Sequence, residues 1–300
     1  MGELEPRPGD VLLLRSPGLL GWAIRFFDGA EVDRAALVLT DRRGAEAVGD
    51  SVAVSPLTEI IAGTERVIVR RLKESAPMDA VLGRAEDLRS SPVSGRPEMV
   101  LALLACGRKL PPAPSLRSVQ RACLEAGTAA LRGAVPLVGA QFVWRCYEDA
   151  LPEPSDIYTV RLNDLHNLEV VSGVPVVPGA GVSRRLGRGV HPASLLCWAS
   201  QPVVRSRLGT IAAGEAAPPL EQALATYQRE VRDGAAGVQP ARAEADAVLA
   251  SVQKFAGAWS GESPPIARGA LPPQLEMLFR GAADLCTAGD LLRSEDLFTV

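Results

Sequence analysis

The side chains best suited to nucleophilic or metal chemistry are few and widely separated in this sequence. It contains two histidines and five cysteines, at His166, His191, Cys106, Cys123, Cys146, Cys197 and Cys286. No pair among them has the CxxC or Cys/His spacing of zinc ligands. The sequence therefore predicts reduced thiols in a cytosolic protein that uses no metal and no cofactor.

The composition excludes several classes of protein. The 300 residues are 47% hydrophobic, which is too apolar for a disordered chain, and the net charge of −3 with 4% aromatic residues argues against nucleic-acid binding. The polar N-terminus, MGELEPRPGD, is unlike a secretory signal, and no apolar run reaches the ~20 residues of a membrane span. We therefore expect a cytoplasmic protein without a transmembrane segment.

The periodicity of apolar residues predicts an α+β chain. Continuous apolar or β-branched runs favour strands near residues 11–15, 35–40, 45–49, 66–72 and 167–171. Apolar residues at helical spacing favour helices near residues 19–27, 78–89, 98–108, 116–131, 138–150, 219–232, 241–257 and 272–292. We expect a small antiparallel sheet with helices packed around it.

A change of composition predicts the division of the chain. Residues 172–190 are rich in Gly, Pro and Arg, which is typical of a linker or an exposed loop. We expect a first domain over residues 1–171, this linker, and a helical C-terminal extension over residues 191–300.

Several segments of the first domain, taken in order, match one known pattern. Gly9-Asp10 precedes an aliphatic run, residues 32–39 contain a second aliphatic run, Glu46 is followed by Ala47, and residues 139–143 read GAQFV. Over residues 8–171 the chain resembles the permuted papain-like amidases of the NlpC class, whose relatives include lecithin:retinol acyltransferase-type proteins. The resemblance implies a circularly permuted papain-like fold.

The resemblance also implies where the catalytic pair of the family would stand. The histidine position holds Arg34 and the cysteine position holds Gly139. Arginine stays charged and accepts no proton, and glycine has no side chain to attack with. The sequence therefore predicts a catalytically inactive, amidase-like protein that binds or scaffolds, with a protein, a peptide or a small anionic ligand as its partner.

The resemblance implies a ligand-binding cleft at the degenerate site. Its expected residues are Trp22, Arg34, Glu46, Gly139, Ala140 and Gln141. The family places the residue matched by Glu46 beside its histidine, so we expect the Arg34 and Glu46 charges to lie within about 6 Å of each other. We expect Asp10, ahead of the first strand, to serve in a turn or a cap.

Two other interpretations stay open at this point. In the first, the chain is an active cysteine hydrolase or acyltransferase on peptide amides or lipid esters, with Cys146 and His166 as relocated catalytic residues. Cys146 lies seven residues after Gly139, about two helical turns deeper, where a buried and inert thiol is expected. In the second, the chain is an unrelated α/β binding module.

Overall fold

The structure is a computed structural model, and it describes most of the chain. The described residues are 5–74, 76–90, 93–131, 135–150, 156–160, 162, 194–199, 201–205, 217–235, 242–260, 275, 277–278 and 285–300. Both histidines, the strand predicted at 167–171 and the predicted linker at 172–190 lie outside the described residues.

A six-stranded sheet forms one half of the molecule, in the strand order β4-β3-β2-β1-β5-β8. Every neighbouring pair in this sheet is antiparallel. The strands are β1 (Val11–Arg15), β2 (Arg34–Val38), β3 (Arg43–Val48), β4 (Ser51–Pro56), β5 (Arg66–Leu72) and β8 (Leu297–Thr299). A separate parallel pair joins β6 (Val93–Ser94) to β7 (Val135–Pro136). The α+β class and the antiparallel sheet are confirmed.

The central strands are buried on both faces, which explains their continuous apolar runs. One face of β2, with Ala35 and Leu37, packs in a core shared with helices α3 (Asp79–Arg89), α6 (Gly139–Glu148) and α12 (Ala288–Arg293). The opposite face, with Ala36 and Val38, packs against the short helix α2 (Leu57–Ile61). Because side chains alternate along a strand, the parity of a residue on β2 decides which helix it meets.

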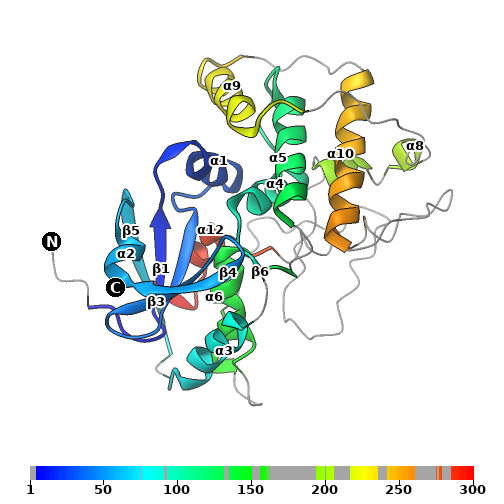
Figure 1. The fold of residues 1–300 in the computed structure, drawn as a ribbon. Coiled ribbons are helices and arrows are strands. Elements are labelled where there is room, and N and C mark those ends of the chain that lie inside the picture. The colour runs from blue at the N-terminus through cyan, green and yellow to red at the C-terminus, as the bar shows by residue number, and fades with distance from the viewer. Residues whose placement is uncertain are drawn as a thin grey trace.

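A second apolar core lies between helices, beside the sheet (Figure 1). Its helices are α1 (Gly18–Asp28), α4 (Pro97–Gly107), α5 (Leu116–Leu131), α7 (Leu195–Ala199), α9 (Leu220–Arg232) and α10 (Arg242–Ser260). The short elements η1 (Asp156–Tyr158) and α8 (Pro202–Arg205) complete the described structure. Within the described residues, no helix combines the length and apolar character needed to cross a membrane.

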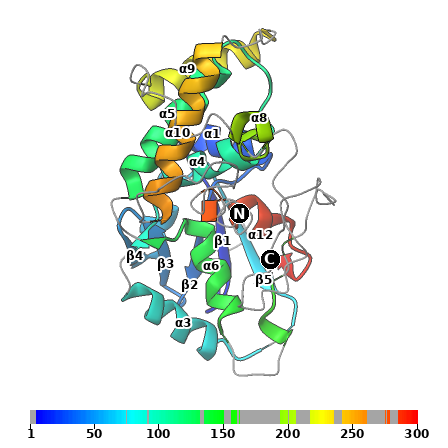
Figure 2. The ribbon, with the colours of Figure 1, turned by 90° about the vertical axis from the view of Figure 1, so that its right-hand side faces the viewer.

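The end of the chain contains a strand that the sequence patterns did not predict. Within the helix predicted at 272–292, the described residues 275, 277 and 278 are helical, and Ala288–Arg293 forms α12, which is six residues long. The strand β8 then pairs with β5. Figure 2 shows α12 beside α6, on the sheet side of the molecule. The local cause is a capping box, in which Thr287 and Asp290 bond each other's backbone amide groups and fix the start of α12.

Several short elements escaped the sequence patterns, among them β4 and α2 in the first domain. Strand β4 follows β3 after a two-residue turn in which Gly49 has a φ of 61°, and helix α2 follows β4 directly. The segment SVAVSP is short and partly exposed, so its alternation is weak as a strand signal.

Candidate functional site

The site predicted from the family resemblance is centred on the first turn of α6. This helix begins at Gly139, after Val138 as the N-cap residue. A Cβ atom placed on Gly139 would have the carbonyl oxygens of Ala35 and Ala47 as its nearest neighbours, each at 3.8 Å. The end of the helix therefore abuts β2 and β3. The three residues that meet there, Gly139, Ala35 and Ala47, carry no nucleophile and no proton acceptor in their side chains.

Arg34 and Glu46 form the ion pair that the sequence predicted. The Arg34 Nη2 atom donates to the Glu46 Oε2 atom at 2.6 Å, and the two side chains are 37% and 13% exposed. By strand alternation, both side chains lie on the α2 face of the sheet, whereas Ala35 and Ala47 face α6. The structure therefore brings Arg34 to Glu46, while Gly139 lies at the opposite face of β2.

The other expected cleft residues belong to two different cores. Trp22, on α1, stacks on Phe26 with ring centroids 5.1 Å apart and packs against the helical core. Ala140 is buried in the core on the α6 face of the sheet, and Gln141 is buried on the same helix. Trp22 therefore packs against the core between the helices, and Ala140 packs in the core between α6 and the sheet.

Cys146 has the environment expected for an inert thiol. Its side chain is fully buried in the core shared by α6 and the sheet, and this burial raises its pKa well above the ordinary value. Arg84 opposes that shift and Asp149 adds to it. The prediction of a buried thiol is confirmed, and His166, its proposed partner, lies outside the described residues.

The remaining thiols are equally unsuited to attack. All five cysteines are described, and none of them forms a disulfide. Cys106, Cys123 and Cys286 are buried, and burial raises the pKa of Cys123 to about 12. Cys197 is half-buried, and desolvation raises its pKa as well. A reactive cysteine needs a lowered pKa and access to solvent, and this combination is absent from all five.

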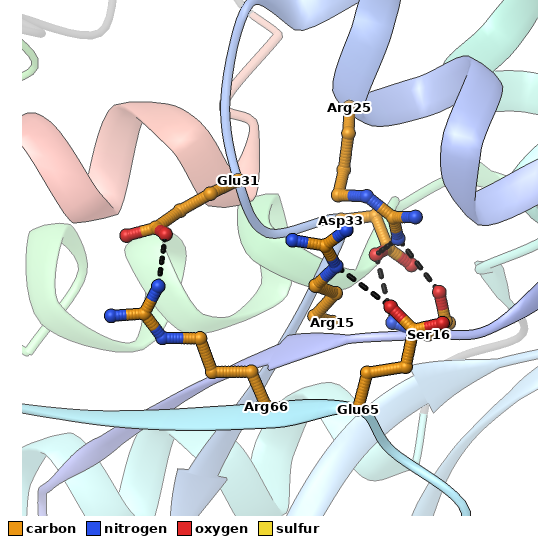
Figure 3. A network of polar contacts seen from close by, with 7 residues as sticks. All are labelled: Arg15, Ser16, Arg25, Glu31, Asp33, Glu65 and Arg66. Carbon is orange, nitrogen blue, oxygen red and sulfur yellow. Dashed lines mark hydrogen bonds and ion pairs between the residues drawn. The ribbon is translucent and has the colours of Figure 1, made fainter.

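A buried ion pair fixes the start of β2 just before Arg34 (Figure 3). The Asp33 Oδ1 atom accepts hydrogen bonds from the Ser16 amide at 2.9 Å and from Arg25 Nη1 at 2.5 Å. The Arg25 Nη1 atom also donates to the Ser16 carbonyl oxygen at 2.7 Å. The Arg25 and Asp33 side chains are 10% and 2% exposed, so this pair connects α1 to both strand ends away from solvent.

Two solvent-exposed ion pairs flank this buried one. Arg15 donates to Glu65 at 2.7 Å, and Arg66 donates to Glu31 (Figure 3). All four side chains are about half exposed, and pairs of that kind contribute little to stability. The buried Arg25–Asp33 pair therefore fixes the chain just before Arg34, and the two exposed pairs add little to it.

A second buried ion pair was missed by the sequence reasoning. Asp10 accepts the amide hydrogen of Arg7 at 2.8 Å, which confirms its expected role in a turn. Its carboxylate also accepts two hydrogen bonds from Arg71, at 2.7 Å each, and its side chain is 1% exposed. The register of β1 on β5 places Val11 opposite Arg70, so this pair follows from the strand pairing and not from local sequence.

A third buried carboxylate lies where α1, α4 and α12 meet. The Asp28 Oδ1 atom is 3.6 Å from an Arg108 nitrogen and 3.7 Å from an Arg293 nitrogen. Burial raises the pKa of Asp28, and the neighbouring Asp290 raises it further against the opposing effect of Arg293. Gly289 is required beside it, because a Cβ there would lie 2.3 Å from the Asp28 carboxylate.

Comparison with known proteins gives one short sequence match. No family model matches the chain. Over 74 residues it is 31% identical to the probable lipoprotein peptidase YaeF of Escherichia coli K12, a stretch that makes up 25% of this chain and 27% of that protein. The chain therefore matches about a quarter of the length of this curated relative.

A solved structure is also similar over part of its length. The metalloprotein yiiX from Escherichia coli O157:H7 aligns with 49% of this chain and 67% of its own, with 17% sequence identity and a TM-score of 0.32. The short match to YaeF is what connects this chain to a peptidase-like sequence.

Proposed function

We propose that this chain is a non-catalytic binding protein with a degenerate, permuted papain-like amidase fold. The observation that carries the proposal is the meeting of Gly139 with Ala35 and Ala47 at the first turn of α6. A thiol amidase needs a cysteine whose pKa is lowered by a helix N-terminus and a neighbouring base. At this helix end the chain presents hydrogen and methyl side chains instead.

The state of the natural thiols supports the same proposal. Cys146 is on the correct helix for a relocated nucleophile, yet it is fully buried and its pKa is raised. A thiol of this kind is almost wholly protonated near neutral pH and is shielded from a substrate. The absence of disulfides among the five cysteines also fits a reducing compartment, which we take to be the cytoplasm.

A binding role would use surface charge near the degenerate position. More than a third of the Arg34 side chain is exposed while it holds Glu46, so its guanidinium can also meet an anionic group of a peptide or protein partner. The hydrogen bond to Glu46 would then hold the Arg34 guanidinium in the orientation needed for that contact.

The test is a comparison of hydrolysis by the protein and by its Cys146→Ser variant. Aryl esters and amino-acid anilides serve as substrates because they report thiol and hydroxyl nucleophiles alike. We expect both proteins to give the rate of buffer alone. A faster rate that is lost in the variant would establish the relocated cysteine, and a faster rate that persists would reveal another nucleophile. Either result would overturn the proposal.

A further inference from the structure

A pocket of about 310 Å³ lies away from the first turn of α6, beside the buried Asp10–Arg71 ion pair. Its walls come from three segments that are distant in sequence: the loop before β1, the chain that follows β5, and β8 at the C-terminus. The volume is at the lower end of the range found for sites that bind small molecules.

The floor of the pocket presents an oriented guanidinium. Asp10 holds Arg71 through the Nε and Nη2 atoms, and Nη2 also donates to the Glu5 carbonyl oxygen at 3.4 Å. Within the described part of the chain, Nη1 is not used by these bonds, and 21% of the side chain is exposed. Because Asp10 already fixes the guanidinium plane, a ligand would meet a donor that needs little further ordering.

The rim carries two more cations. Arg7 and Lys73 line the pocket, both are exposed, and neither side chain has an acidic partner among the described residues. Glu74 is the opposing charge on the rim, and the Asp10 carboxylate is already committed to Arg71. The charges therefore leave an excess of positive charge for a bound anion.

The remaining walls are apolar. Phe298 lies on β8 with 41% of its surface exposed, and Met78 covers Gly9 so closely that a Cβ on Gly9 would lie 2.5 Å from the Met78 sulfur. A ligand that fits this pocket thus combines a negative group for the floor with a small apolar body for Met78 and Phe298.

We propose that this pocket binds a small organic carboxylate, with its negative group at Arg71 and its aliphatic part against Met78 and Phe298. The proposal is independent of the state of Gly139, because none of the pocket residues lies at the first turn of α6. It gives the C-terminal strand a role, since Phe298 would close one side of a site that the N-terminal loop begins.

The test is a titration of the ¹⁵N-labelled protein with hexanoate and with hexanamide, which has the same carbon chain and no charge. We expect saturable shifts of the Gly9 and Lys73 amide signals, with hexanamide binding about tenfold more weakly because a charge-assisted bond is lost. Equal affinity for the two probes would overturn the proposal, as would the absence of saturable shifts at millimolar hexanoate.

Variants of the exposed rim locate the site without disturbing the buried pair. Arg7→Gln combined with Lys73→Gln should weaken hexanoate binding by about tenfold, and Glu74→Gln should strengthen it. Arg42→Gln is the matched control, because this exposed arginine lies in the turn between β2 and β3 and does not line the pocket. Affinity that responds equally to the rim variant and to the control would refute the site.

Discussion

The sheet half and the helical half of the molecule are held together by different kinds of contact. In the sheet half, the buried carboxylates of Asp10 and Asp33 stand just before β1 and β2. Each of them binds an arginine from another segment of the chain. Between the helices, the interior is mainly apolar side chains and thiols, among them Leu104, Cys106 and Phe255, with a few buried polar side chains such as Gln120 and Ser251. The contrast teaches that charge fixes the irregular segments that border the candidate sites, whereas apolar burial supplies most of the contact between the helices.

The largest effect is expected from the buried pair on the sheet side. Asp10→Ala would leave Arg71 without its carboxylate and the Arg7 amide without its acceptor. Removal of one member of a buried pair costs about 4 kcal/mol. Urea unfolding measures this loss, and Asp41→Ala, at a carboxylate that is 79% exposed, is the matched control with a change below about 0.5 kcal/mol. A loss for Asp10→Ala as small as that of the control would remove the distinction between the two halves.

A slightly smaller loss is expected from the helical core. Leu104 is 1% exposed on α4, and Leu104→Ala should lower the free energy of unfolding by about 3 kcal/mol through lost burial and a cavity. Because no charge is involved, the loss should be the same at low and at high salt. A loss that shrinks strongly as salt is added would show that the helical half also depends on charge.

The pH dependence of Asp28 tests the contact between the two halves. Its pKa in the folded chain lies above the ordinary value of 3.8, so the folded state holds this proton more tightly than the unfolded state. The stabilisation is complete below that ordinary value and is lost as the pH rises through the folded pKa. Asp28→Asn should therefore gain stability relative to the natural chain as the pH is raised from acid to neutral.

Unfolding of both proteins over a series of pH values measures this difference. A gap between them that stays constant with pH would show that Asp28 has an ordinary pKa. A variant that loses stability relative to the natural chain as the pH rises would give the opposite sign and contradict the account.

The smallest effect is expected from Arg34 and Glu46. The Arg34 side chain is 37% exposed, so solvent screens the pair, and a double-mutant cycle with alanine should give a coupling of about 0.5 kcal/mol. A coupling above about 2 kcal/mol would show that this pair contributes to stability as the buried ion pairs do.

Local patterns were sufficient to predict much of the fold. The helix at 116–131 and the strand at 66–72 were predicted with the bounds observed, because one has a helical period and the other a dense β-branched run. Strand β8 was missed because three residues carry no period, and its place depends on pairing with β5, more than two hundred positions earlier in the chain.

The candidate site was predictable only in part, for a related reason. The Arg34–Glu46 contact could be predicted because the two residues lie on β2 and β3, which follow each other in the chain and pair directly. The face of β2 that meets Gly139 depends on strand parity, which the sequence alone left open, and the Asp10–Arg71 pair depends on the register of β1 against β5. The contacts that could not be predicted are therefore those that depend on strand pairing between segments distant in the sequence.

The central claim is that no natural thiol of this chain acts as a nucleophile. Its most direct test is the rate of alkylation by iodoacetamide near neutral pH, read for each cysteine by peptide mass spectrometry, with Gly139→Cys as the positive control. The control thiol fits at the first turn of α6, where a Cβ has its nearest neighbours at 3.8 Å, and should react quickly because a helix N-terminus lowers a thiol pKa.

The account predicts that the natural Cys146 reacts only when the protein is unfolded, while the introduced cysteine reacts in the folded state. Rapid alkylation of Cys146 in the folded natural protein, with an apparent pKa below the ordinary thiol value, would contradict it.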